Sequence, residues 1–144
     1  MAAHWDIADS TLQEKLQAYI DKLVADGLDW SCHLFQNDYT PIPGSDISNY
    51  TECTFPGYSS AVIPVADWGT VTVSAHVASS TLSSELEFTA DSSGFSSQSV
   101  YGYYVLDSAD VYKYGERFSD TRTIHPDDVL KVTPIQREAT YPNP

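Results

Sequence analysis

The sequence predicts a mainly β protein, an antiparallel β-sandwich or jelly-roll-like domain that follows one N-terminal amphipathic helix. One stretch near the N-terminus carries apolar residues at helical spacing. Seven short stretches after it either alternate apolar and polar residues or form short apolar runs. Clusters of Gly, Pro, Asp and Ser separate several of them. Many short strands with turns between them are typical of sandwiches and jelly rolls.

The helix is expected over residues 10–26. A capping box at Ser10 or Thr11 would begin it, and Gly27 would end it in the left-handed conformation. Packing of its apolar stripe on the domain's own core is the favoured interpretation, and contact with a neighbouring subunit is the alternative. The stripe consists of Leu12, Leu16, Ile20, Leu23 and Val24.

The strands are expected after Gly27, where the apolar period changes from 3.6 to 2. Turn signals follow at 91–94, 107–110 and 125–128. The seven candidate strands are 30–35, 61–65, 69–77, 84–90, 100–106, 111–118 and 128–135.

Three segments are expected along the chain. Residues 1–29 form an N-terminal arm and helix, and residues 30–135 form the β-sandwich domain. Residues 136–144, "QREATYPNP", carry two prolines and few apolar groups, which favours an extended or disordered C-terminal tail. A chain of 144 residues is long enough for one domain with a core.

The long connection between residues 35 and 61 is rich in prolines and glycines but also carries large apolar groups. Loops of this length are usually functional or disordered, and the apolar groups argue against disorder. In one interpretation, Tyr50, Phe55 and Tyr58 cover the domain's own core. In the other, a subunit contact is made by Tyr39, Ile42 and Ile47, and the candidate contact set then comprises Tyr39, Ile42, Ile47, Tyr50, Leu12, Leu16 and Ile20.

The charge distribution argues against nucleic-acid and membrane partners. The net charge is −13, and no Lys or Arg occurs between Lys22 and Lys113, a span that holds eleven acidic residues. Phosphate backbones and anionic lipid surfaces both require clustered cations. Self-repulsion that maintains solubility is the favoured interpretation, and a basic partner surface is the alternative.

No catalytic, cofactor-binding or metal-binding motif stands out. The four histidines are scattered, no serine lies in a GxSxG motif, and no glycine-rich phosphate loop is present. His33 is expected on the opposite strand face from Cys32, so the two would not share a metal. Buried free thiols are the favoured interpretation of Cys32 and Cys53, and a structural disulfide between them, if the particle leaves the cell, is the alternative. We therefore expect no enzyme activity, no cofactor and no metal.

Several short motifs resemble those of small tailed-bacteriophage virion proteins. The resemblance runs from about residue 30 to 135, and the order and spacing of the motifs agree with the family. The motifs are Leu34-Phe35-Gln36-Asn37 with Thr40-Pro41, Tyr50-Thr51-Glu52 with Phe55-Pro56-Gly57-Tyr58, Val100 to Asp107 ("VYGYYVLD"), Glu116-Arg117-Phe118, and Asp128 to Pro134 ("DVLKVTP").

The resemblance implies a non-enzymatic particle component in a virion assembled in the bacterial cytoplasm. A capsid decoration (cement) protein is the first hypothesis. Such a protein would bridge subunits of the major capsid protein or other virion subunits, as a homo-oligomer with a trimer favoured. A tail or fibre-attachment component is the alternative within the same class.

A host-glycan-binding module is the alternative from another class. Aromatic rings on a sheet can stack on sugars, although cross-strand packing is the commoner reason for them. The candidate aromatic surface consists of Trp68, Tyr101, Tyr103, Tyr112 and Tyr114.

Overall fold

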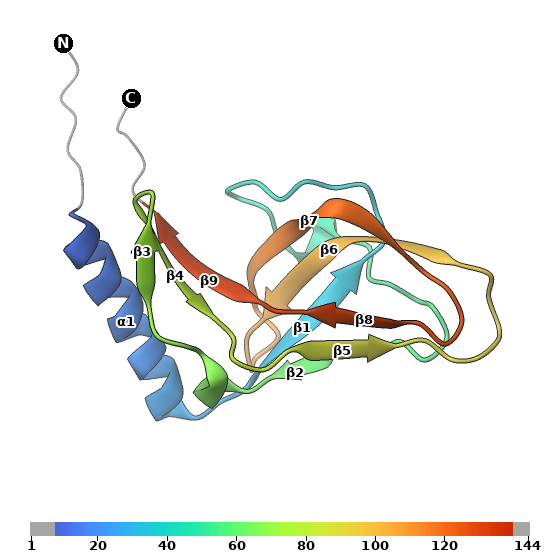
Figure 1. Cartoon of the computed structure of the whole chain (residues 1–144), viewed down its shortest axis with the longest axis horizontal. Coiled ribbons are helices and arrows are strands. Elements are labelled where there is room, and N and C mark those ends of the chain that lie inside the picture. The colour runs from blue at the N-terminus through green and yellow to red at the C-terminus, as the bar shows by residue number, and fades with distance from the viewer. Residues whose placement is uncertain (1–7, 140–144) are drawn as a thin grey trace, which may run out of the picture. The chain divides into compact units, whose positions relative to one another are not determined.

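The computed structural model describes residues 8–139 and shows a mainly β protein with one α-helix and three antiparallel sheets (Figure 1). The prediction of the β class with an N-terminal helix is confirmed. The chain divides into two compact units that interleave along the sequence. Within the described residues, unit 1 comprises 8–28, Val65–Glu85 and 133–139, and unit 2 comprises Asp29–Pro64 and Leu86–Val132.

This division differs from the three predicted segments. The helix and the C-terminal segment, expected as 1–29 and 136–144, both belong to unit 1, together with a segment from the middle of the chain. The residues from Ile135 to Ala139 form a strand and not a free tail. Residues 1–7 and 140–144, which include the rest of the expected arm and tail, lie outside the described residues.

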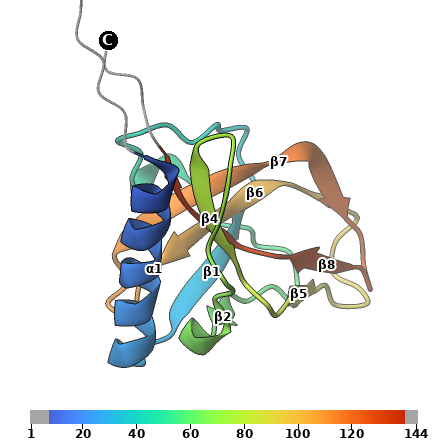
Figure 2. The same cartoon turned by 60° about the vertical axis from the view of Figure 1, so that its left-hand side comes forward.

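Unit 1 packs the helix α1 (Asp9–Asp26) on a small sheet with strand order β3-β4-β9 (Figure 2). Leu12, Leu16 and Ile20 lie on one helical face and are all buried. Gly27 ends the helix in the left-handed conformation, and its N–H donates to the Leu23 carbonyl, as predicted. The predicted capping box is wrong, because the N-cap is Ala8 and no side chain bonds there. The short helix η2 (Val65–Asp67) completes this unit.

The expected strand 69–77 is instead part of a hairpin. Strand β3 (Thr72–Ser74) pairs with β4 (Val77–Thr81), and the chain reverses at Ala75 and His76, which both have positive φ. Ala and His do not mark a two-residue hairpin turn as Asn-Gly or Asp-Gly does. The alternation of apolar and polar residues over 69–77 therefore predicted one continuous strand. Strand β9 (Ile135–Ala139) pairs with the other side of β4.

Unit 2 contains a four-stranded sheet with the order β2-β1-β6-β7. Strand β1 (Trp30–Phe35) lies between β2 (Ala61–Ile63) and β6 (Gln98–Leu106), and β7 (Tyr112–Ile124) follows β6. Strands β6 and β7 form a long hairpin with two irregularities in register.

A two-stranded ladder completes unit 2. It pairs β5 (Leu86–Thr89) with β8 (Val129–Val132), and its buried side chains alternate along both strands. The expected strand 128–135 therefore ends at Val132, and β9 begins a separate strand after Pro134.

Candidate functional site

The long connection of unit 2 folds back over one face of its sheet. Its segment 51–53 pairs with β1, because the Cys53 N–H donates to the Leu34 carbonyl and Phe35 forms a bridge with Glu52. This pairing brings Tyr50 over the sheet, where its ring stacks on Tyr104 at 4.7 Å between centroids. The connection is therefore an ordered part of unit 2.

Tyr50 is the centre of an aromatic cluster. It is 8% exposed, its ring meets Phe35 edge-on, and its hydroxyl lies 2.6 Å from that of Tyr112. Burial, followed by the bond to Tyr112, raises the pKa of Tyr50 well above its usual range. Together with buried Phe55, Tyr50 confirms that aromatic groups of this connection cover the core of their own unit.

The candidate contact residues fall into three groups by exposure. Four of the seven are buried within their own units, so their side chains are not available to a partner in this fold: Tyr50, Leu12, Leu16 and Ile20. Tyr39 is half-buried against the aromatic cluster. Ile42 and Ile47 are 64% and 48% exposed. The surface that remains is the loop from residue 38 to 49, which we call the Ile42 loop.

Side-chain hydrogen bonds fix the Ile42 loop. The Ser45 hydroxyl accepts from the Ile42 N–H at 2.9 Å and lies 2.6 Å from the Tyr39 hydroxyl. Asp46 caps the short helix η1 (Ile47–Asn49), with a reciprocal bond between the Asp46 N–H and the Asn49 side chain. The Asp46 carboxylate accepts from the Ser48 hydroxyl and from the Ser48 N–H, and these two bonds hold the pKa of Asp46 below its usual range.

The two ends of the Ile42 loop are fixed by hydrogen bonds of Asn37 and by an ion pair with Arg117. The Asn37 side chain donates to the Asn49 carbonyl and accepts from the Thr51 N–H. Arg117 of β7 forms an ion pair with Asp38 at 2.6 Å and lies over the ring of Tyr101. The loop therefore presents two exposed isoleucines from a fixed backbone.

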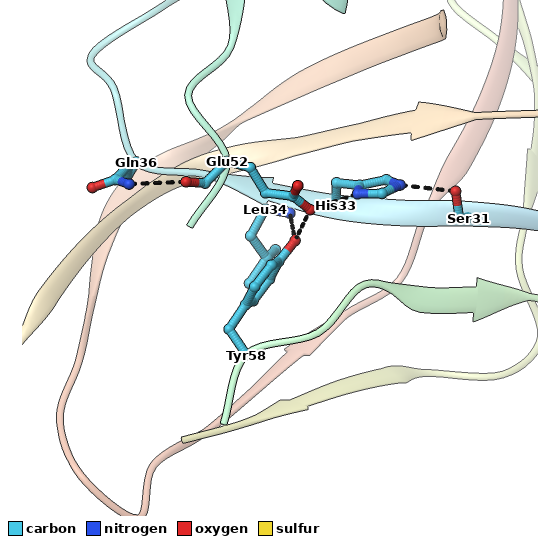
Figure 3. Close-up of polar contacts among 6 residues, drawn as sticks. All are labelled: Ser31, His33, Leu34, Gln36, Glu52 and Tyr58. Carbon is cyan, nitrogen blue, oxygen red and sulfur yellow. Dashed lines mark hydrogen bonds and ion pairs between the residues drawn. The ribbon is translucent and has the colours of Figure 1, made fainter. Parts of the chain in front are cut away.

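A second arrangement lies on β1 (Figure 3). His33 Nδ1 lies 2.6 Å from Glu52 Oε2, and His33 Nε2 lies 2.8 Å from the Ser31 hydroxyl. Tyr58 donates its hydroxyl to the same Glu52 oxygen at 2.6 Å and accepts from the Leu34 N–H at 3.1 Å. We call Ser31, His33, Glu52 and Tyr58 the His33 network.

The His33 network is only partly covered. The side chains of His33 and Glu52 are 13% and 40% exposed, and the His33 ring stacks on Tyr104 at 5.0 Å. Cys32, on the opposite strand face, is fully buried, as predicted. In a line of serine, histidine and carboxylate, the histidine can take the proton of the serine hydroxyl and so increase the nucleophilicity of its oxygen.

Sequence reasoning missed this network. Alternation along β1 places Ser31 and His33 on one face, and this signal was available. The pairing of residue 52 with β1 is non-local, however, and nothing in the sequence indicates it. The motif "YTECTFPGY" instead has a structural basis, because Tyr50, Glu52, Phe55 and Tyr58 all fix the connection to the sheet.

The candidate aromatic surface does not form one platform. Tyr101 and Tyr112 pack against the cluster around Tyr50, whereas Tyr103 contacts Tyr114 on the other face of the sheet. Tyr103 is buried, and Trp68 is a buried residue of unit 1. The hypothesis of a stacked-sugar site therefore loses its geometric basis.

Two searches of the described part of the chain bear on other classes of site. Between residues 8 and 139, no three His, Cys, Asp or Glu side chains gather closely enough to hold a metal ion. No helix of that range is both long and apolar enough to cross a membrane.

No protein-family model and no curated protein matches the chain. The function is therefore inferred from the chain's own residues.

Proposed function

We propose that this protein is a structural component of a tailed-bacteriophage particle, specifically a capsid decoration (cement) protein, whose role in the particle requires no enzyme activity. The Ile42 loop binds the major capsid protein or another virion subunit, and the protein acts in the virion, which is assembled in the bacterial cytoplasm. One observation carries the proposal: Ile42 and Ile47 are 64% and 48% exposed on a loop whose backbone is already fixed. A fixed loop loses little conformational entropy on binding.

The energetics favour a protein that binds in many copies. Burying the exposed part of the two isoleucines would contribute about 1–2 kcal/mol each. This contribution gives one copy only a modest affinity. In a homo-oligomer, with a trimer favoured, the linked copies bind together, and avidity raises the apparent affinity. The net charge of −13 opposes non-specific aggregation of the protein before assembly.

The finer fold assignment belongs to the same proposal. We infer that unit 2 is a small sandwich of the jelly-roll-like kind, in which the β5–β8 ladder covers one face of the four-stranded sheet. The stacking of Tyr58 on Phe88 of β5 at 6.1 Å supports this inference, because it links the connection that follows β1 to the ladder.

The experiment is quantitative mass spectrometry of purified particles from the source of the chain. A ratio of hundreds of copies per particle supports a decoration protein, whereas about three to a dozen copies favours the alternative, a tail or fibre-attachment component. Absence of the protein from the particles would overturn the proposal.

Matched variants test the surface itself. Ile42→Ser with Ile47→Ser is expected to lower particle occupancy at least tenfold and to leave thermal unfolding almost unchanged. Val129→Ser is the control, because Val129 is similarly exposed, at 47%, on β8. Equal occupancy for both variants would exclude the Ile42 loop as the contact surface.

A further inference from the structure

The hydrogen bonds of the His33 network have one consistent direction. Because the Leu34 N–H donates to the Tyr58 oxygen, the Tyr58 proton is free to bond to Glu52. An ionised Glu52 carboxylate has only acceptors, so His33 Nδ1 must carry the proton of their 2.6 Å bond. In the neutral imidazole, Nε2 is then the acceptor, and the Ser31 hydroxyl donates to it at 2.8 Å.

We propose that Ser31 is a nucleophilic serine, with His33 as its general base and Glu52 as the group that positions the base. The substrates are small activated carboxylic or phosphoric esters. This activity is separate from binding through the Ile42 loop and does not depend on the virion proposal. Nucleophile and base within hydrogen-bond reach, with the base oriented by a third group, is the geometry that such chemistry requires.

A small reagent can reach Ser31. The Ser31 side chain is half-buried, and its cross-strand neighbour Val62, on edge strand β2, is 60% exposed. The His33 ring stacks on the ring of Tyr104 with an interplanar angle of 12°, and this contact holds the imidazole in place.

In the reaction, Ser31 Oγ attacks the carbonyl carbon or the phosphorus while its proton moves to His33 Nε2. The bond to the leaving group breaks, and the leaving group takes the electron pair and then that proton. Ser31 is left as an ester. Water would hydrolyse the ester in the reverse sense, with His33 again as the base.

The position of Ser31 within the sheet predicts slow turnover. Ser31 has a register partner on each side, Val62 on β2 and Leu106 on β6, so its backbone belongs to the sheet. Its N–H is therefore not positioned as an oxyanion donor, and the lack of one such donor typically costs about 10²–10³ in rate. We expect both the esterification of Ser31 and the hydrolysis of its ester to be slow.

The test is labelling of the full chain with a fluorophosphonate probe, followed by peptide mass spectrometry. Attack by Ser31 breaks the phosphorus–fluorine bond and releases fluoride. General-base assistance is typically worth about 10²–10⁴ in rate, so we expect Ser31 to react at least 100-fold faster than Ser99. Ser99 is the internal control, because it is an exposed strand serine.

Three variants test whether His33 and Glu52 activate Ser31 or whether Ser31 is labelled only because the probe can reach it. Ser31→Ala removes the label, and His33→Gln removes the base. Glu52→Gln keeps an amide oxygen that can accept from Tyr58 and from His33 Nδ1, but it removes the negative charge that stabilises the imidazolium formed during the attack. Each variant should lower labelling at residue 31 at least 10-fold while near-UV circular dichroism stays native.

Two results would overturn the proposal: equal labelling of Ser31 and Ser99 in the unaltered chain, or undiminished labelling in a folded His33→Gln variant. The first comparison needs no substitution, so a variant that fails to fold leaves the proposal testable.

Discussion

Gly115 lies directly beneath the phenol of Tyr50: a Cβ at position 115 would be 2.2 Å from the Tyr50 hydroxyl oxygen and 2.8 Å from its ring carbon Cζ. Gly115 is the register partner of Tyr104, on which the Tyr50 ring stacks. The absence of a side chain on β7 thus makes room for the ring that fixes the long connection to the sheet.

Gly115→Ala is expected to destabilise the protein by about 1–3 kcal/mol, because the methyl group overpacks this site. Tyr50→Phe loses the bond to the Tyr112 hydroxyl and should cost about 1 kcal/mol. The double variant should cost less than the sum of the two, because removing the hydroxyl relieves the closest contact. Chemical denaturation of all four proteins measures this coupling, and strict additivity would contradict it.

Gly102→Ala should be more damaging than Gly115→Ala. A Cβ at position 102 would meet the backbone carbonyl oxygen of Glu116 at 2.0 Å as well as the ring of Phe35 at 2.7 Å. A carbonyl within the β6–β7 pairing cannot move as a side chain can. We expect the variant to lose native circular dichroism or to melt far below the Gly115→Ala protein, and comparable melting of the two variants would contradict this prediction.

Tyr58→Phe is expected to destabilise the protein by about 1–3 kcal/mol, because it removes the acceptor of the Leu34 N–H and a donor to Glu52. Tyr101→Phe is the control, since the contact of the Tyr101 ring with Arg117 does not use its hydroxyl. Urea unfolding of the two variants should separate them clearly. A loss of equal size in both would show that the Tyr58 hydroxyl contributes nothing specific.

Cys32 and Cys53 are expected to resist an aromatic disulfide reagent at about pH 8. Burial raises the pKa of Cys53 to about 12 and that of Cys32 further, so neither thiol forms the reactive thiolate in the folded protein. Both should react promptly in denaturant. The absorbance of the aromatic thiolate that the reagent releases measures the reaction. Fast release under native conditions would contradict the burial of the two thiols.

Leu16→Ala is expected to cost about 2–5 kcal/mol, since Leu16 is 3% exposed on the face of α1 that packs on the sheet of unit 1. Val24→Ala, on the same helix at 44% exposure, should change stability by less than about 0.5 kcal/mol. If the units unfold in separate transitions, the loss should appear in the transition of unit 1. Similar losses for both variants would indicate that α1 does not pack through this face.

Asp107→Asn should weaken the β6–β7 hairpin near neutral pH. The Val111 N–H, followed by that of Ala109 and by Lys113, holds the pKa of Asp107 below its usual value of 3.8. A depressed folded-state pKa contributes stability that is full above the unfolded value and is lost as the pH falls through the folded value. The difference in melting temperature between the two proteins should therefore shrink below about pH 3.8 and disappear under stronger acid. A difference that persists unchanged there would contradict the role of the charge.

Much of the local structure could be predicted from the sequence. The apolar stripe and Gly27 indicated α1, and alternation located the strands that begin near Trp30, Leu86, Val100 and Tyr112. These signals depend on neighbours in the chain. The hairpin at Ala75 and His76 was missed because its turn lacks the Gly, Asn or Asp that usually marks a two-residue hairpin turn with positive φ.

The candidate sites depended on pairings that local patterns do not encode. The exposure of Ile42 and Ile47 was consistent with the predicted contact loop. The burial of Tyr50 required knowledge that β7 carries a glycine opposite it. The His33 network required the pairing of residue 52 with β1, which depends on the whole fold of unit 2.

The interleaving of the two units has a consequence for the order in which they form during synthesis. Every described residue of unit 2 has left the ribosome once Val132 has emerged, whereas the sheet of unit 1 lacks β9 until residue 139 follows. The residues of the Ile42 loop and of the His33 network can thus fold before β9 has joined the sheet on which α1 packs. A nascent chain stalled near residue 132 would therefore have all the described residues of unit 2 and an incomplete unit 1.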